Sequence, residues 1–170
     1  MTIAEQFLGE FDAESQTTRK FLQRLPEDKL TWQPHEKSMT AGQLALHIAA
    51  SPASIIQMAM RDEFLLSDIP QSREQPVSLQ QVMEAFEESI ATVEKNLPTI
   101  SDERMQKTWR LVDNGKELMA MPRATFLRNV LFNHIIHHRG QFGVYLRLVG
   151  AKVPSSYGPS GDELPDFLNK

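Results

Sequence analysis

The sequence predicts an all-α protein, a bundle of four long helices with one small hairpin-like excursion before the last helix. Three observations indicate this class. Four segments carry apolar residues at the three- and four-residue spacing of an amphipathic helix. Prolines, glycines and helix-capping residues separate these segments. One Asn-Gly pair with alternating apolar and polar neighbours indicates a β-hairpin between the third and the fourth helix.

The first helix is expected from about Thr2 to Leu25, and Pro26 marks its end. Polar residues interrupt its apolar side near the middle, namely Glu14, Thr17 and Thr18. Two interpretations stay open, because these side chains face either solvent or a polar interior.

The second helix is predicted from about Ala41 to Phe64, after an ordered loop that offers Ser38 and Thr40 as N-caps. Pro52 lies inside this helix. It is expected to kink the helix, because proline removes a backbone donor and crowds the preceding turn.

A polar linker is predicted over residues 67–76, followed by a third helix with Ser78 as its N-cap. This helix has the most regular apolar stripe of the chain, formed by Leu79, Val82, Met83, Phe86, Ile90, Val93 and Leu97. None of these side chains binds metal ions, so the third helix is not expected to supply a ligand from this stripe.

The hairpin is placed between Pro98 and Pro122, and the last helix is predicted from about Arg123 to Val149 with Gly150 as its C-cap. The residues that follow, about 151–170, are rich in Pro, Gly and Ser and are expected to form an irregular tail. We therefore expect a single domain over residues 1–170.

The composition excludes several classes of function. The chain has 170 residues and no cysteine, so it forms no disulfide and offers no thiolate to a metal ion. Its net charge is -4, and the sequence has no basic stripe of the kind that nucleic-acid binders carry. No apolar run is long enough to cross a membrane, and the N-terminus does not have the pattern of a secretory signal. A cytoplasmic protein is expected.

The last predicted helix contains two histidines at a metal-chelating spacing. His134 and His138 are four residues apart, so their imidazoles project from the same face of a helix. They belong to a seam of three- and four-residue steps that predicts the inward side of the helix, formed by Leu127, Leu131, His134, His138, Gln141, Tyr145 and Leu148. The two histidines are therefore expected inside the bundle.

A third histidine, His47, lies on the predicted inward face of the second helix, between Leu44 and Ile55. Three imidazoles then point to one interior region, and they suit Zn, Ni, Fe or Mn without selecting among them. A lone inward histidine is more often a hydrogen-bonded core residue than a ligand. The joint arrangement favours a metal site, because burying several imidazoles is costly unless a partner satisfies them.

The other polar residues near this site have weaker cases. His137 points about 100° away from its neighbour His138 and is expected to stay outside the site. Arg139 is expected off the seam, paired with an acidic side chain. Asp12 and Glu14 of the first helix are candidates for a base, although solvated surface is the default for such residues.

At these residues the chain resembles the DinB-like superfamily, which includes the YfiT-type metal-dependent hydrolases and thiol S-transferases. The resemblance rests on three segments that together span most of the chain, Trp32 to Ala49, Asn133 to Gly150 and Val153 to Glu163. It implies a four-helix bundle, often a homodimer, in which His47, His134 and His138 bind one divalent ion.

The resemblance also implies a metal-dependent enzyme that acts on a small molecule, either a hydrolase or a transferase of a low-molecular-weight thiol. The ion acts as a Lewis acid in this hypothesis, and a thiol must come from a cosubstrate because the chain has no cysteine. Gln141, Tyr145 and His35 are the candidate catalytic residues that orient this thiol. The alternatives are a non-catalytic metal-binding module for stress response or dimerisation, and an interaction domain with purely structural histidines.

Overall fold

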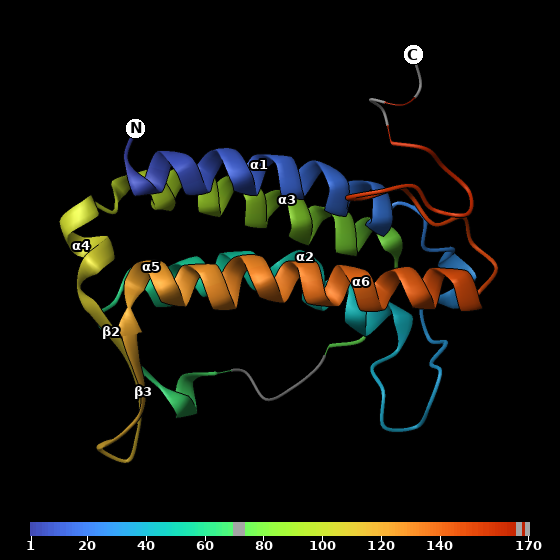
Figure 1. The fold of residues 1–170 in the computed structure, drawn as a ribbon. Coiled ribbons are helices and arrows are strands. Elements are labelled where there is room, and N and C mark those ends of the chain that lie inside the picture. The colour runs from blue at the N-terminus through green and yellow to red at the C-terminus, as the bar shows by residue number, and fades with distance from the viewer. Residues whose placement is uncertain (70–73, 166–167, 169–170) are drawn as a thin grey trace.

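The computed structural model describes residues 1–69, 74–165 and 168, and within them the protein is mostly helical (Figure 1). The long helices are α1 (Ile3–Leu22), α2 (Ala41–Ala59), α3 (Leu79–Asn96) and α6 (Asn133–Leu148). Shorter helical turns connect them: η1 (Glu27–Lys29), η2 (Leu66–Asp68), η3 (Leu97–Thr99) and α4 (Asp102–Gln106). The strands are β1 (Glu63–Leu65), β2 (Thr108–Asp113) and β3 (Lys116–Pro122).

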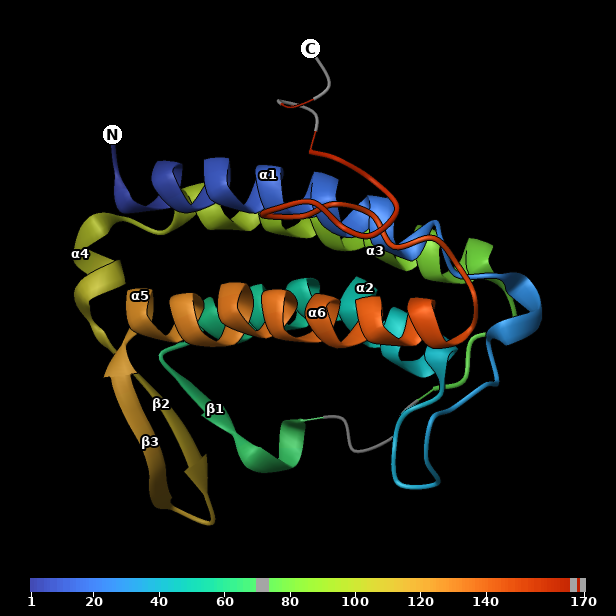
Figure 2. The same ribbon diagram turned by 45° about the vertical axis from the view of Figure 1, so that its right-hand side comes forward.

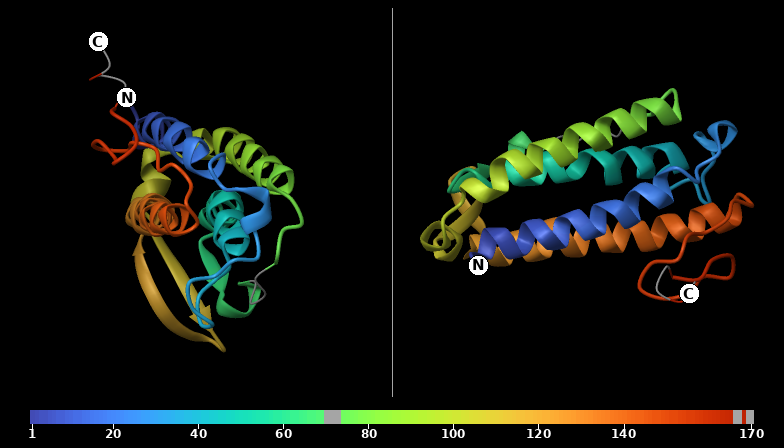
Figure 3. Two further views of the ribbon diagram at one scale, coloured as in Figure 1. Left: turned by 90° about the vertical axis from the view of Figure 1, so that its right-hand side faces the viewer. Right: turned by 90° about the horizontal axis from the view of Figure 1, so that it is seen from above.

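The long helices pack side by side in a closed ring of contacts. α2 packs against α3 and α6, and α1 also packs against α3 and α6. The end-on view shows this arrangement, with α1 and α3 in one layer and α2 and α6 in the other (Figure 3). α6 continues without a break from α5 (Arg123–Phe126) and from η4, a π-helical segment (Leu127–Phe132).

Local capping residues set the bounds of these helices. Thr40 caps α2, and Gln43 completes a capping box with it. Ser78 caps α3, as expected. At the end of α6, Gly150 has a φ of 79° and the N–H of the next residue, Ala151, donates to the carbonyl of Leu146 at 2.9 Å. This pattern is a Schellman motif and confirms the predicted C-cap.

The sheet lies at one end of the helices and contains the predicted hairpin (Figure 2). β2 and β3 are antiparallel, and Asn114 and Gly115 between them have positive φ values of 47° and 79°. Such angles are typical of the tight turn that an Asn-Gly pair favours. β1 adds to β2 in parallel and makes the sheet three-stranded. The predicted all-α class is therefore correct only in part.

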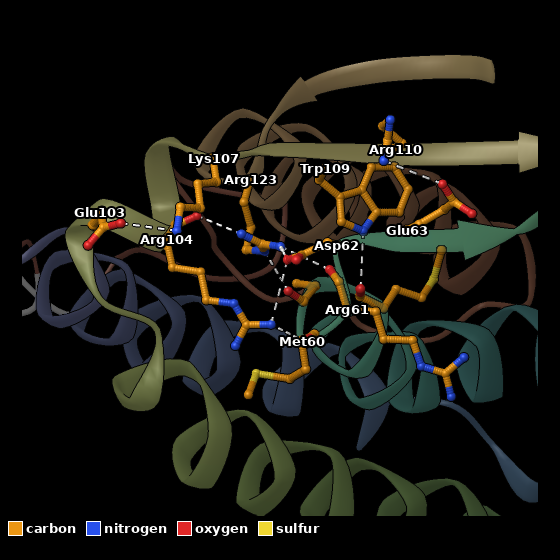
Figure 4. A network of polar contacts seen from close by, with 12 residues as sticks. Met60, Arg61, Asp62, Glu63, Glu103, Arg104, Lys107, Trp109, Arg110 and Arg123 are labelled. Atoms are coloured by element: carbon orange, nitrogen blue, oxygen red, sulfur yellow. Dashed lines mark hydrogen bonds and ion pairs between the residues drawn. The ribbon is translucent and has the colours of Figure 1, made fainter.

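β1 was not predicted, because the second helix was expected to continue to Phe64, whereas α2 ends at Ala59. Side chains from outside α2 bind its last carbonyl groups (Figure 4). Arg123 donates to the carbonyl of Ala59 at 2.7 Å, and Trp109 donates to that of Met58 at 3.1 Å. These donors satisfy the helix end, and the chain then leaves in an extended conformation to pair with β2.

The apolar core consists of two clusters of buried side chains. One cluster gathers around Phe11 and Trp109, and the other around Phe21 and Phe142. Five other buried side chains are polar or charged and come from four helices: Ser15, Thr18, Ser89, Arg123 and Arg139. Thr18 is 1% exposed and faces the interior, whereas Glu14 and Thr17 are half-buried.

The tail after Gly150 is irregular in the residues described, and its own hydrogen bonds fold it back on itself. Ser160 Oγ donates to the carbonyl of Val153 at 2.6 Å, and Asp162 accepts from the N–H of Val153 at 2.8 Å. Parts of the predicted linker and tail, residues 70–73, 166–167 and 169–170, lie outside the described residues. Among the described helices, none has the length and apolar character needed to cross a membrane.

Candidate metal centre

Three imidazoles meet between α2 and α6. His47 comes from α2, while His134 and His138 come from successive turns of α6. One ring nitrogen of each residue lies within 4.8 Å of the corresponding nitrogen of the other two. The centres of the three rings lie 4.5–4.9 Å apart. The structure therefore brings together the three histidines that the sequence predicts as ligands.

The spacing of the nearest nitrogens suits a shared ion. His47 Nε2 lies 3.2 Å from His134 Nε2. Two nitrogens that bind one tetrahedral ion at about 2.0–2.1 Å lie roughly 3.3 Å apart. Two neutral imidazoles have the same separation when they share one hydrogen. An ion can thus take the place of that hydrogen without a large movement of either ring.

The chemistry of the donor set also fits a first-row divalent ion. The group contains three imidazoles and no carboxylate, and all three side chains are half-buried. Neutral imidazole is a good ligand for Zn, Ni and Fe, whereas Mg and Ca prefer oxygen. The buried Nδ1 of His134 has no hydrogen-bond partner among the described residues, so the ring is oriented by packing and by its Nε2.

The π-helical segment η4 stands directly before these ligands. It adds a residue to a turn and so changes which side of the helix faces α2 from His134 onward. The expectation of a uniform helix missed this segment. The hydrophobic pattern does not mark it, because Leu127 and Leu131, both inside the segment, are buried at the four-residue spacing of an ordinary helix.

Burial, and to a smaller extent the neighbouring charges of His138, His47 and His137, lower the pKa of His134 to about 4. The ordinary value is about 6.5. His134 is therefore neutral at pH 7, with a lone pair that a metal ion can use.

This shift predicts the acid response of the ion-free protein. The unfolded chain binds a proton at His134 below about pH 6.5, but the folded chain does not until about pH 4. The stability that His134 contributes is complete above pH 6.5 and declines as the pH falls toward 4. An NMR titration of the His134 ring should show a midpoint near 4, and a midpoint near 6.5 would contradict the burial argument.

A matched variant isolates this effect from other titrating groups. Between pH 7 and pH 5, the free energy of unfolding should fall less in His134→Gln than in the wild type, as measured with urea at both pH values.

Comparisons with known proteins agree with this fold. The sequence model of the DinB family matches residues 1–165. The chain belongs to the DinB family. It is 27% identical over 165 residues to the uncharacterized protein YrdA of Bacillus subtilis. The matched region covers 96% of this chain and 93% of YrdA.

Two solved structures of DinB-like proteins have a similar fold. A protein from Bacillus cereus superposes with a TM-score of 0.68 at 26% identity and covers 90% of this chain and 97% of its own. YjoA from Bacillus subtilis superposes with a TM-score of 0.66 at 21% identity and covers 88% of this chain and 96% of its own. The second likeness concerns the fold alone.

The other residues predicted for the site of this DinB-family protein lie in different surroundings. Gln141 is next to the histidines, with its Oε1 2.9 Å from His138 Nδ1. Tyr145 is buried in the second apolar cluster, and its hydroxyl donates to the carbonyl of Met39 at 3.3 Å. His35 is exposed in the loop before α2, and its Nδ1 accepts from the N–H of Lys37 at 3.1 Å.

One expectation about α6 was wrong in the DinB-family structure, because Leu148 was expected on the inward seam but is 59% exposed. Arg139 pairs with an acidic side chain of α1, as expected, and is buried, with 2% of its surface exposed. The physical reason is that α6 packs against α1 as well as α2, so its buried face is wider than a single seam. Leu148 belongs to the last turn of α6, where its side chain stays open to solvent.

The buried partner of Arg139 is Glu14 of α1, whose Oε2 lies 2.7 Å from Arg139 Nη1. Tyr157 of the tail covers this pair, because its hydroxyl donates to the other carboxylate oxygen at 2.8 Å. Glu14 is thus engaged by other groups and is not part of the histidine cluster, and Asp12 is exposed. His137 is also exposed, although its ring centre lies 4.8 Å from that of His138.

Proposed function

We propose that this DinB-family protein is a metal-dependent enzyme that acts on a small molecule, as a hydrolase or as a transferase of a low-molecular-weight thiol. The observation that carries the proposal is the convergence of three imidazoles from two helices, with no carboxylate or fourth histidine in the group among the residues that the structure describes. Three protein ligands and one open position are typical of catalytic zinc sites, whereas structural sites are closed by four.

The half-buried position of the cluster supports a catalytic role for a bound ion rather than a purely structural one. His47, His134 and His138 are neither fully enclosed nor on the open surface. An ion held there supplies Lewis acidity, which lowers the pKa of a bound water or thiol and makes it a nucleophile at neutral pH. The three imidazoles hold the ion without adding negative charge, so its full charge acts on the bound group.

The chain itself supplies no sulfur nucleophile, because it contains no cysteine. A thiol must therefore enter as a cosubstrate through the open position. We also infer that the four long helices form a four-helix bundle and that the protein is a homodimer, in line with the family resemblance.

The test measures ion content and reactivity on the same preparation. The wild type should bind one Zn or Ni ion per chain, measured by mass spectrometry of the metal. The loaded protein should accelerate the displacement of chloride from 1-chloro-2,4-dinitrobenzene by glutathione, bacillithiol or mycothiol, or the hydrolysis of a nitrophenyl ester, and a chelator should abolish the acceleration. Absence of a bound ion would refute the metal site.

A protein that binds the ion but accelerates neither reaction would support the alternative, a non-catalytic metal-binding module. The half-buried cluster favours the enzyme over this alternative, because a purely structural ion needs no open position.

A further inference from the structure

Gln141 lies one helical turn after His138 on α6 and faces its ring. The Gln141 Oε1 is 2.9 Å from His138 Nδ1, which is a hydrogen-bond distance. An amide oxygen only accepts hydrogen bonds, so the hydrogen in this contact must be on Nδ1. A neutral imidazole has one hydrogen, and His138 Nε2 therefore carries a lone pair.

We propose that Gln141 is a positioning residue that holds His138 as the Nδ1–H tautomer and selects its Nε2 as the metal ligand. The proposal rests on the metal site proposed above and deepens it by assigning the ligand atom and the residue that sets it. Metal-binding histidines commonly donate their second N–H to an acceptor, which fixes the ring and makes it a better ligand.

The contrast with His134 strengthens this assignment. The Nδ1 of His134 is buried without a hydrogen-bond partner in the described residues, and its Nε2 lies 3.2 Å from His47 Nε2. Gln141 thus gives His138 an orienting acceptor that His134 lacks. The Gln141 oxygen accepts the hydrogen bond from the His138 ring, and this role requires no contact with the substrate. Gln141 is therefore assigned a supporting role in place of the catalytic role that the sequence predicts.

The experiment compares Gln141→Met, which removes the acceptor at similar size, with Gln141→Glu, which keeps an acceptor. Gln141→Met should weaken zinc binding about 10- to 100-fold, measured by chelator competition, and Gln141→Glu should restore it. Gln57→Met is the matched control, because Gln57 is exposed on α2. It should leave zinc binding unchanged.

A second readout uses the ion-free protein and separates this inference from the metal site. Long-range ¹H–¹⁵N NMR spectra of the histidine rings should show the hydrogen of His138 on Nδ1 in the wild type and a shift toward Nε2 in Gln141→Met. A wild type with the hydrogen on Nε2 would overturn the proposal, because the amide would then present its NH₂ group to Nδ1.

Each further outcome also decides between the two proposals. A wild type that binds no zinc but has the predicted tautomer would refute the metal site and support the role of Gln141 on the ring. Normal zinc affinity and an unchanged tautomer in Gln141→Met would overturn the role of Gln141 while leaving the metal site intact.

Discussion

Replacement of Arg123 by alanine is expected to lower the free energy of unfolding by about 3–5 kcal/mol, because several carbonyl groups lose their buried donor. Arg123 is fully buried, with 0% of its surface exposed. Its guanidinium donates to the carbonyl groups of Ala59 at 2.7 Å, Arg61 at 3.0 Å and Arg104 at 2.6 Å, and it pairs with Asp62 (Figure 4).

The size of this effect comes from the groups that the substitution leaves behind. Two of the three carbonyls belong to the end of α2 and the residues just after it, and they lose their donor. A buried polar group without a partner costs roughly 1–3 kcal/mol. The side chain also leaves a cavity where α2, α4 and the sheet meet. The salt bridge adds less, because the Asp62 side chain is 73% exposed.

Arg110→Ala is the matched control, because Arg110 also lies near the sheet. Its ion pair with Glu63 has an N–O distance of 3.6 Å, and its side chain is 50% exposed. An exposed pair of this kind contributes about 0–1 kcal/mol. Urea unfolding of both variants measures the difference, and equal losses would contradict the central role of Arg123 at the end of α2.

The second large effect is expected for His134→Ala combined with His138→Ala, which should abolish stoichiometric ion binding. Site-bound zinc contributes about 10–16 kcal/mol in small zinc domains, shared among its ligands. Loss of one ligand then weakens binding by at least roughly 100-fold, since 1.4 kcal/mol corresponds to a factor of ten. Loss of two leaves only His47, which cannot chelate an ion alone.

His137→Ala is the control on the same helix. His137 is exposed and outside the cluster of ligand nitrogens, so its replacement should leave one ion per chain. Titration calorimetry with Zn and Ni on the wild type and both variants gives the comparison. An ion that survives the double substitution would place the binding site elsewhere and refute the assignment.

Local patterns in the sequence were sufficient to predict the features that depend on a single helix or a single turn. The four-residue spacing of His134 and His138 puts both rings on one face of any α-helix. The angle between successive residues separates His137 from them. The Asn114-Gly115 pair predicts the hairpin, because both positions require a positive φ. The family resemblance follows from the same local segments and is confirmed over residues 1–165.

Other features depend on which elements lie side by side, and spacing along one helix does not encode this. Glu14 and Arg139 are 125 residues apart and pair only because α1 packs on α6. The end of α2 at Ala59 depends on donors from Arg123 and Trp109. The strand β1 follows from this early end, and hence the small sheet, which the helical pattern of the second segment did not predict.

The sequence by itself determined the family, the long helices, the hairpin and the pair of histidines one helical turn apart, because each is encoded in contiguous residues. The tertiary structure decided that His47 joins this pair at 3.2 Å from His134, that Gln141 faces the ring of His138, and that α6 buries Arg139. The physical reason is that a side chain's direction follows from its own helix, whereas its partner is set by the packing of that helix against its neighbours.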